Sequence, residues 1–374
     1  MQLKNSEKII NIKDVQKVKK VLVGMSGGVD SSVTAALLKD KNYEVIGGTM
    51  EIFPDYEQKP LDEGGCCSLS SIEDAKMIAH KLDIPHYTFN LKDVFQKEVI
   101  NDFVNEYSKG NTPNPCIVCN KEIKFKALLY KALQLGIDYI ATGHYAKITE
   151  ENGRFLLKKA KDDYKDQTYM LYGFKQEQLK HTLMPLGDYT KDKIREIAKQ
   201  LNFSVHNKPD SQEICFVPDN DYTRFLKDNY PEIGAKGPIL DTEGNKLGEH
   251  EGLFNYTIGQ RRGLGVSAPY PLYVKELDQK QNAVIVGKDE EIFFDGLIAE
   301  DINLISLSKI DQPLDIEVKI RYNSPEVDAK LIPIKADKLK VIFNEKQRAV
   351  TPGQSAVFYK GDLVIGGGII KEGF

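Results

Sequence analysis

Residues 24–32 read GMSGGVDSS and directly follow the apolar run at 21–23. The two serines at the end of this stretch begin SSVTAALLKDK (31–41), in which Val33, Ala36 and Leu37 share one helical face. Glycines let backbone N–H groups approach a phosphate, serine hydroxyls donate to its oxygens, and the start of a helix adds positive potential. The segment therefore predicts an anion-binding loop between a buried strand and a helix. It lacks the spacing and lysine of a Walker A loop, and it is not GxGxxG. A glycine-rich turn with capping serines is the simpler alternative.

Strand and helix patterns alternate from this loop to about residue 216. YEVIGGTM (43–50), HYTFNL (86–91) and DYIATGHY (138–145) predict strands, separated by segments with apolar residues at helical spacing. Strands separated by helices of this length form βαβ units in a parallel sheet. We therefore expect an N-terminal α/β domain over residues 1–216, in which 1–16 form an extension before the first strand.

The remainder of the chain changes pattern twice. Residues 217–289 are rich in Asp, Pro and Gly, which predicts a small connecting domain. Within residues 290–374, apolar and polar residues alternate in IEVKIRY (316–322), and other short strand patterns such as SAVFY (355–359) follow, with turn residues between them. This pattern predicts a C-terminal antiparallel β-barrel.

The composition is typical of a globular protein and gives no sign of a membrane-spanning or secreted one. The 374 residues are 41% hydrophobic and 28% charged, as in an ordinary globular protein, and no stretch approaches the roughly 20 apolar residues of a membrane helix. The N-terminus lacks the apolar segment of a secretory signal, so we expect a cytoplasmic protein with reduced thiols and no membrane partner. The net charge of −4 gives no global sign of a nucleic-acid partner, and the local lysine and arginine groups are weak signals.

The phosphate loop resembles the SGGxDS signature of the PP-loop ATP pyrophosphatases. That resemblance implies ATP as substrate, cleavage between its α and β phosphates, and adenylation of a carbonyl oxygen. It also implies that Asp30 helps to hold Mg²⁺ and pyrophosphate. Amide formation, lysidine synthesis on tRNA and sulfur insertion all remain open to such a protein.

Two of the five cysteines favour sulfur insertion, which needs a nucleophilic thiolate and a thiol that can hold a persulfide. Cys119 lies in TPNPCIVCNKEIKFK, where we expect a helix to begin just after it, so that the helix dipole and Lys121 stabilise its thiolate. Cys215 lies far along the chain in KPDSQEICFVPD, where a mobile loop is expected. Cys66 and Cys67 are expected to be structural thiols.

Over nearly its full length the chain resembles the tRNA-specific 2-thiouridylase family. The resemblance rests on GMSGGVDSS, TPNPCIVCNKEIKF, ATGHYA, KDQTYMLY, DSQEICF, YTIGQRRGLG and TPGQSAVFY, which occur in this order. It implies ATP-dependent 2-thiolation of the wobble uridine of tRNA, with AMP and pyrophosphate as products. It also implies the lysine, glutamate and glutamine tRNAs as substrates, and a cysteine desulfurase or a sulfur-relay protein as sulfur donor.

The resemblance also implies individual roles. Cys119 would be the nucleophile and Cys215 the cysteine that receives persulfide sulfur, and a disulfide between them would remain after turnover. ATP contacts would come from Gly24, Met25, Ser26, Gly27, Gly28, Val29, Asp30, Ser31, Met50 and Gly143. Contacts to tRNA would come from Asn114, Pro115, Cys116, His144, Lys165, Asp166, Gln167, Arg321, Tyr322 and Gln354.

Cys116 departs from the family pattern, because many members have Asp at this position. A thiol, with a pKa of about 8.5 against about 3.9, is a poor replacement for an aspartate base. Cys116, Cys119 and Cys215 could instead hold three irons of a [4Fe–4S] cluster that delivers the sulfur. Two rival functions remain: an amide-forming PP-loop ligase, and a non-catalytic metal protein that binds RNA.

Overall fold

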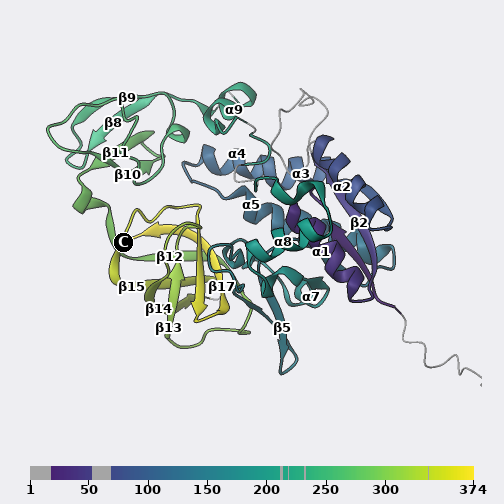
Figure 1. Cartoon of the computed structure of the whole chain (residues 1–374). Helices are drawn as coiled ribbons and strands as arrows, with labels where there is room; N and C mark the ends of the chain where they lie inside the picture. Colours follow the sequence, from purple (N-terminus) through teal and green to yellow (C-terminus); the bar gives the residue numbers. More distant parts are fainter. Residues whose placement is uncertain (1–17, 53–68, 211–213, 218, 231–232, 336) are drawn as a thin grey trace, which may run out of the picture.

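The computed structural model describes residues 18–52, 69–210, 214–217, 219–230, 233–335 and 337–374. It has three parts: an α/β part, a small sheet and a barrel, the last two lying one above the other beside the first (Figure 1). The predicted extension at 1–16 and the residues Cys66 and Cys67 lie outside the described residues.

The α/β part is built on a parallel sheet, as predicted, and this sheet has five strands. Its order is β3-β2-β1-β4-β7, with β1 in the centre. In parallel strands the carboxyl ends share one edge, so the ends of β1, β2 and β4 lie together there. The strands are β1 (Lys20–Gly24), β2 (Glu44–Glu51), β3 (His86–Asn90), β4 (Tyr139–Ala141) and β7 (Thr182–Leu183).

Helices cover both faces of this sheet, and successive residues of β1 are accordingly buried on opposite faces. Val21 and Val23 are fully buried against one group of helices, whereas Leu22 between them is buried against the other. The first group is α1 (Val29–Asp40), α2 (Leu69–Lys81) and α8 (Lys191–Gln200). The second is α3 (Lys92–Phe95), η3 (Gln96–Ile100), α4 (Asn101–Ser108), α5 (Pro115–Val118), η4 (Cys119–Leu128) and α6 (Leu129–Gln134).

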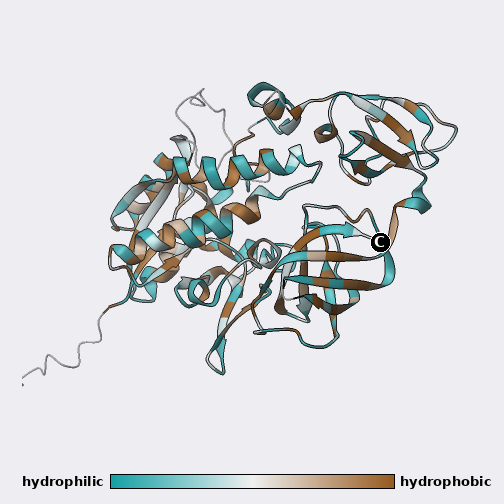
Figure 2. Ribbon diagram, turned by 180° about the vertical axis from the view of Figure 1, so that it is seen from behind, coloured by the Kyte–Doolittle hydropathy of each residue, from teal (hydrophilic) through white to brown (hydrophobic). Residues whose placement is uncertain are grey.

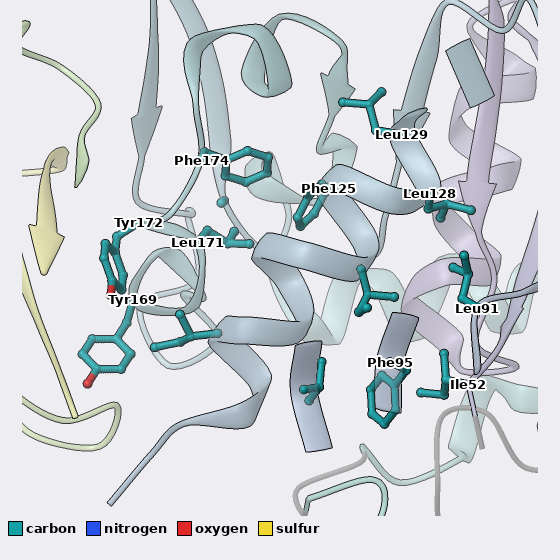
Figure 3. Packing of buried hydrophobic residues seen from close by; sticks show 14 of the residues in the cluster. Ile52, Leu91, Phe95, Phe125, Leu128, Leu129, Tyr169, Leu171, Tyr172 and Phe174 are labelled. Carbon is teal, nitrogen blue, oxygen red and sulfur yellow. The ribbon is translucent and has the colours of Figure 1, made fainter. Parts of the chain in front are cut away.

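The second group of helices packs into a core that continues toward the barrel. Figure 3 shows Phe95 and Leu128 from these helices in one cluster with Tyr169 and Tyr172. Tyr359 and Val364 of the barrel belong to the same cluster. Short elements connect the parts: η5 (Thr168–Leu171), α7 (Gln176–Lys180), η6 (Pro185–Asp188), η7 (Ser204–Asn207), α9 (Tyr222–Asn229), η9 (Leu253–Asn255) and η10 (Asp289–Ile292).

The small sheet contains one parallel and two antiparallel pairings in the order β10-β11-β8-β9. It buries its own apolar cluster, which includes Ile239, Val274 and Val284. Its strands are β8 (Gly237–Asp241), β9 (Lys246–His250), β10 (Tyr273–Asp278) and β11 (Ala283–Gly287).

The C-terminal part is a closed antiparallel barrel of six strands, which confirms the predicted barrel. The order is β12-β15-β14-β13-β16-β17, and β17 pairs back with β12 to close the circle. Closure leaves no unpaired strand edge. The strands are β12 (Phe293–Leu304), β13 (Leu314–Lys319), β14 (Val327–Lys335), β15 (Lys338–Arg348), β16 (Ser355–Lys360) and β17 (Leu363–Gly373).

A hairpin from the α/β part joins the barrel, which the sequence patterns did not predict. It consists of β5 (Lys147–Glu151) and β6 (Arg154–Lys158), and Lys158 pairs with Leu363 of β17. The Arg154 side chain donates to the carbonyl oxygens of Ile305 and Leu307 at 2.7 and 2.6 Å. These bonds fasten the barrel to the α/β part.

Apolar residues follow the cores of all three parts, as the brown segments along their helices and strands show (Figure 2). Within the described ranges, no helix has the length and apolar character required to cross a bilayer.

Candidate active site

The glycine- and serine-rich loop lies at the carboxyl edge of the parallel sheet. β1 ends at Gly24 and α1 begins at Val29, as predicted. Gly27 has φ +66°, and a Cβ there would lie 2.3 Å from the carbonyl oxygen of Ser71, so only glycine fits. Ser31 accepts from the Ser26 N–H at 3.2 Å, which folds the loop over the first turn of α1. This is the strand–loop–helix geometry that binds phosphate in other folds.

Not every serine of the loop is available to a ligand. The Ser32 hydroxyl, which we expected to donate to a phosphate, is buried and donates to the Gly28 carbonyl at 2.8 Å. It closes the first turn of the helix instead. The hydroxyls of Ser26 and Ser31 lie 3.4 Å apart at the loop.

Two residues expected to contact ATP lie at the same edge, at the ends of the two strands that flank β1. Met50 lies near the end of β2, half-buried and opposite Phe89. Gly143 follows β4, and a Cβ there would lie 2.8 Å from both Asp30 Cβ and the Ser31 nitrogen. The structure thus gives Gly143 a packing role: its missing side chain lets the end of β4 approach the first turn of α1.

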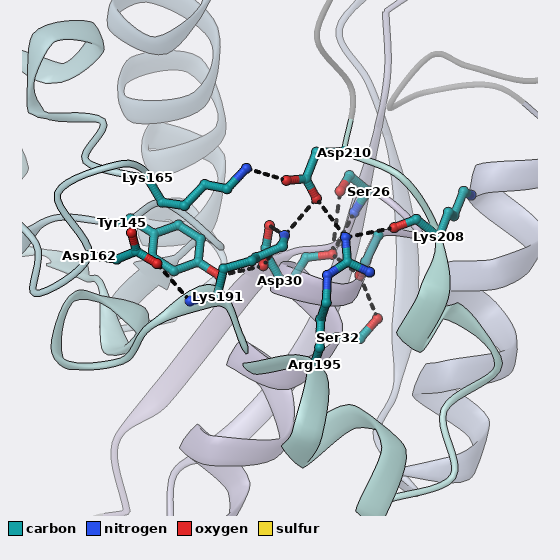
Figure 4. A network of polar contacts seen from close by, with 12 residues as sticks. Ser26, Asp30, Ser32, Tyr145, Asp162, Lys165, Lys191, Arg195, Lys208 and Asp210 are labelled. Carbon is teal, nitrogen blue, oxygen red and sulfur yellow. Dashed lines mark hydrogen bonds and ion pairs between the residues drawn. The ribbon is translucent and has the colours of Figure 1, made fainter. Parts of the chain in front are cut away.

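A network of ion pairs surrounds the loop (Figure 4). Lys191, the first residue of α8, lies 2.7 Å from Asp30 and 2.6 Å from Asp210. Lys165 approaches the other oxygen of Asp210 at 2.8 Å, and the Tyr145 hydroxyl donates to Asp30 at 2.8 Å. The carboxylate of Asp30 is therefore held by a cation and a phenol.

Asp210 is held in the site by its ion pairs with Lys165 and Lys191. Partial burial raises the pKa of its carboxyl, but the hydrogen bonds and charges of Lys165 and Lys191 outweigh this and lower the pKa below its ordinary value. The hydrogen bond to Asp210 in turn raises the pKa of Lys165. Burial, together with the charge of Asp30, raises the pKa of Tyr145, so its phenol stays protonated and donates. Asp210 and Lys165 are therefore charged at neutral pH.

Lys208 connects the segment before Cys215 to the loop. Its ammonium donates to the Gly27 carbonyl at 3.3 Å and pairs with Asp74 at 2.7 Å. Arg195 donates to the carbonyl oxygens of His206 and Lys208. Sequence reasoning missed Lys191, Arg195, Lys208 and Asp210 as site residues, although Asp210 begins the quoted DSQEICF motif.

Cys116 and Cys119 lie on one continuous helix, which begins earlier than expected. The helix starts at Pro115 because Asn114 caps it, accepting from the Ile117 N–H at 3.4 Å. The expectation that Cys119 precedes the helix is therefore wrong: the exposed Cys116 is in the first turn, and the half-buried Cys119 follows it. Since the dipole acts mainly within the first turn, it favours a thiolate at Cys116 more than at Cys119.

Cys215 is a half-buried thiol that packs against the same core as Cys119. The neighbouring Phe216 is buried between Phe95 and Phe103 of the helix layer, with ring centroids at 5.8 and 5.2 Å. Among the residues that the structure describes, no three His, Cys, Asp or Glu side chains are grouped so that they could hold a metal ion. The alternative arrangement, with Cys116, Cys119 and Cys215 around a cluster, is thus not formed among these residues.

Several residues expected to contact tRNA are used within the protein. Asp166 accepts from the Ala160 N–H and from Thr168, and burial raises the pKa of its carboxyl. Gln167 and Tyr145 exchange hydrogen bonds at 2.9 and 3.0 Å. These bonds shape the loop that holds Lys165.

His144 and Tyr322, which were also expected to contact tRNA, are both half-buried. The His144 ring is 2.7 Å from the Thr142 hydroxyl, and burial, then the charge of Lys124, lowers the pKa of the ring well below its ordinary value, so it is neutral at pH 7. The Tyr322 ring lies 6.0 Å from that of Tyr169. Burial raises the pKa of Tyr322, and the charges of Asp166 and Cys116 add to this effect.

Arg321 and Gln354 join parts of the molecule. Nη2 of Arg321 donates to the carbonyls of Ile258 and Ala349 at 3.0 and 2.9 Å. Gln354 donates to the Thr112 carbonyl at 2.7 Å, which holds a barrel loop against the segment before Cys116.

A parallel sheet with a serine- and glycine-rich phosphate loop, joined to a closed barrel, defines an α/β nucleotide-binding protein of the HUP class. Residues 19–219 match the family described as "tRNA methyl transferase HUP domain". Residues 223–288 and 294–370 match the "tRNA methyl transferase PRC-barrel domain" and the "Aminomethyltransferase beta-barrel domain".

The chain belongs to the tRNA-specific 2-thiouridylase family. It is 66% identical over 356 residues to the tRNA-specific 2-thiouridylase MnmA of Halothermothrix orenii, covering 95% of this chain and 99% of that protein. It is 54% identical to the protein of the same name from Acetivibrio thermocellus, with coverage of 94% and 99%. The Clostridium botulinum relative is also 54% identical, with coverage of 94% and 98%.

Proposed function

We propose that this protein is an ATP-dependent tRNA sulfurtransferase that converts the wobble uridine of tRNA to 2-thiouridine. The observation that supports this most directly is the phosphate loop at the sheet edge, in a chain that is 66% identical over 356 residues to a 2-thiouridylase. The two half-buried thiols, Cys119 and Cys215, fit the second requirement, a nucleophilic thiol and a thiol that can hold persulfide sulfur.

ATP lies over residues 24–31 in the proposed complex, with its phosphates at the loop and its adenine toward Met50. Asp30 provides a carboxylate in the first turn of α1 and fits Mg²⁺, which prefers hard oxygen ligands. Magnesium bound there would neutralise charge on the phosphates. The uridine O2 attacks the α-phosphate, pyrophosphate leaves, and the N3 proton passes to solvent.

Sulfur then reaches C2 through the cysteines. A cysteine desulfurase or a sulfur-relay protein loads Cys215 as a persulfide. The Cys119 thiolate attacks the inner sulfur, which forms a Cys119–Cys215 disulfide and releases hydrosulfide. Hydrosulfide displaces AMP from C2, and an external reductant restores both thiols. This persulfide route is favoured over an iron–sulfur cluster because the described residues include no three-ligand group for a metal.

The proposal is tested with purified protein, unmodified lysine, glutamate or glutamine tRNA, ATP, Mg²⁺ and a persulfide donor. We expect 2-thiouridine at the wobble position, detected by mass spectrometry of nucleosides, with one AMP and one pyrophosphate for each sulfur inserted. A tRNA with cytidine at that position is the control and stays unmodified. Formation of ADP and phosphate would contradict the adenylation step.

A further inference from the structure

Lys191 is a buried cation beside the phosphate loop. Its side chain is 9% exposed, and its ammonium lies 2.7 Å from Asp30 and 2.6 Å from Asp210. Lysine is rarely buried to this extent unless it is paired, and a buried ion pair contributes little net stability because desolvation offsets the attraction. The burial therefore suggests a role besides stability.

The Lys191 ammonium lies beside the first turn of α1, next to the phosphate loop. Asp30 is in the first turn of α1, whose N-terminal backbone groups form the anion site. An ammonium in contact with that carboxylate is already at the edge of the site. The Lys191 backbone N–H donates to Asp162 at 2.8 Å, which fixes the start of α8 and directs the side chain toward Asp30.

We propose that Lys191 is a ligand of the β- and γ-phosphates of ATP and of the departing pyrophosphate, and that Asp30 and Asp210 balance its charge before ATP binds. This inference rests on the ATP-dependent activity proposed above. When ATP enters with magnesium, the Asp30 carboxylate is needed by the metal ion, and the ammonium turns to a phosphate oxygen. Lysine suits this exchange, because it is a point charge with three donors on a flexible stem.

If Lys191 binds phosphate, Asp210 weakens nucleotide binding. It pairs with both Lys191 and Lys165, so it competes with phosphate for two cations of the site. Removal of its charge would free these cations for phosphate. A purely structural ion pair predicts the opposite, since loss of Asp210 would then leave buried Lys191 less well placed.

The test is equilibrium binding of magnesium pyrophosphate, ATP and AMP to the full chain without tRNA, by titration calorimetry. For Lys191→Gln we expect pyrophosphate and ATP to bind about 10- to 100-fold more weakly, with AMP nearly unchanged, since one charged hydrogen bond is lost. Lys193→Gln is the matched control on the same helix: Lys193 is an exposed partner of Glu196, and its loss leaves all three affinities unchanged. Lys191→Arg should recover part of the pyrophosphate affinity.

Unchanged pyrophosphate affinity in Lys191→Gln would overturn the proposal. If that variant does not fold, Asp210→Asn decides: tighter binding of pyrophosphate than in the parent supports the proposal, and equal or weaker binding overturns it. These measurements are independent of thiolation. A protein that binds pyrophosphate through Lys191 but makes no 2-thiouridine would refute the proposed function alone.

Discussion

At the scale of single residues, Cys119 and Cys215 are the groups on which the proposed sulfur transfer depends. Both are half-buried and both contact the apolar core below the helix layer, so each thiol is shielded from bulk oxidants yet near the surface. Cys116 differs from them, because it is exposed in the first helical turn. Exposure suits a substrate contact better than storage of a reactive sulfur.

The first prediction concerns these two thiols. Cys119→Ser and Cys215→Ser should each abolish 2-thiouridine formation, because a hydroxyl can neither displace nor hold persulfide sulfur. ATP affinity, measured by calorimetry, should be unchanged, since neither residue belongs to the phosphate loop. A Cys215→Ser protein that thiolates tRNA at the full rate from a persulfide donor would contradict the two-cysteine mechanism.

Cys116→Ala is the matched control for this pair. It should contain no iron or acid-labile sulfide after anaerobic purification, and it should retain thiolation. A brown, iron-containing parent protein that loses both colour and activity in Cys116→Ala would instead establish the cluster route.

The residue scale also shows the limit of sequence reasoning. The phosphate loop was predictable because its residues are contiguous and each has a chemical reason to be there. Lys191 and Asp210 were not, since each is an ordinary charged residue until the fold brings α8 and the segment after η7 to the same loop. A single lysine without a spacing pattern looks like surface.

At the scale of elements, the contact between β4 and α1 positions the phosphate site. Gly143 follows β4 and meets the backbone of Asp30 and Ser31 without room for a Cβ. In α1, Ala35 and Leu38 are buried, whereas Ala36 and Leu37, which were expected to share a face with Val33, are only partly buried. The sequence patterns nevertheless predicted both elements as a strand and a helix. They did not predict this contact, which depends on the absence of a side chain.

Gly143→Ala is the second prediction from this arrangement. The added methyl must displace the first turn of α1, so we expect a loss of about 1–3 kcal/mol in the free energy of unfolding, typical of overpacking, and weaker ATP binding. Gly173→Ala is the control, because its Cβ would lie at ordinary contact distance, 3.6 Å from the Lys121 side chain. Urea unfolding followed by circular dichroism and ATP titration check both; equal stability of the two variants would contradict the packing role.

The hairpin β5–β6 shows why connections between parts were harder to predict than the parts. The alternation of apolar and polar residues within 316–322 and the short apolar run at 355–359 were sufficient to predict barrel strands. Nothing local in 147–158 indicates that the hairpin pairs with β17, whose residues are far away in the sequence. Long-range pairing of this kind depends on the completed fold.

At the scale of the whole molecule, three parts meet near the segment that contains Cys116. Thr112 exchanges hydrogen bonds with the barrel loop, donating to the Pro352 carbonyl at 3.0 Å and accepting from Gln354. Gly353, with φ +88°, allows this close approach, because a Cβ there would lie 2.9 Å from the Thr112 nitrogen. The barrel thereby supports the loop before the candidate nucleophile.

Arg321 extends this junction to the small sheet. Its Nη2 contacts the Ile258 carbonyl of the segment between η9 and β10, the Ala349 carbonyl and the Thr351 hydroxyl of the barrel. Burial lowers the pKa of this guanidinium below its ordinary value, which still leaves it charged at neutral pH. The family resemblance instead implied a contact with tRNA.

The two roles of Arg321 predict different results for Arg321→Gln. If the guanidinium holds the junction, the free energy of unfolding falls by about 1–3 kcal/mol even without tRNA, because hydrogen bonds to a charged group are lost. Thermal unfolding followed by circular dichroism should then begin at a lower temperature, and limited proteolysis should cut between the small sheet and the barrel. Arg262→Gln is the control, because that side chain is exposed nearby in the same segment as Ile258 and should leave unfolding unchanged. If Arg321→Gln unfolds like the parent and loses only tRNA affinity, the arginine is a tRNA ligand and the junction depends on its other contacts.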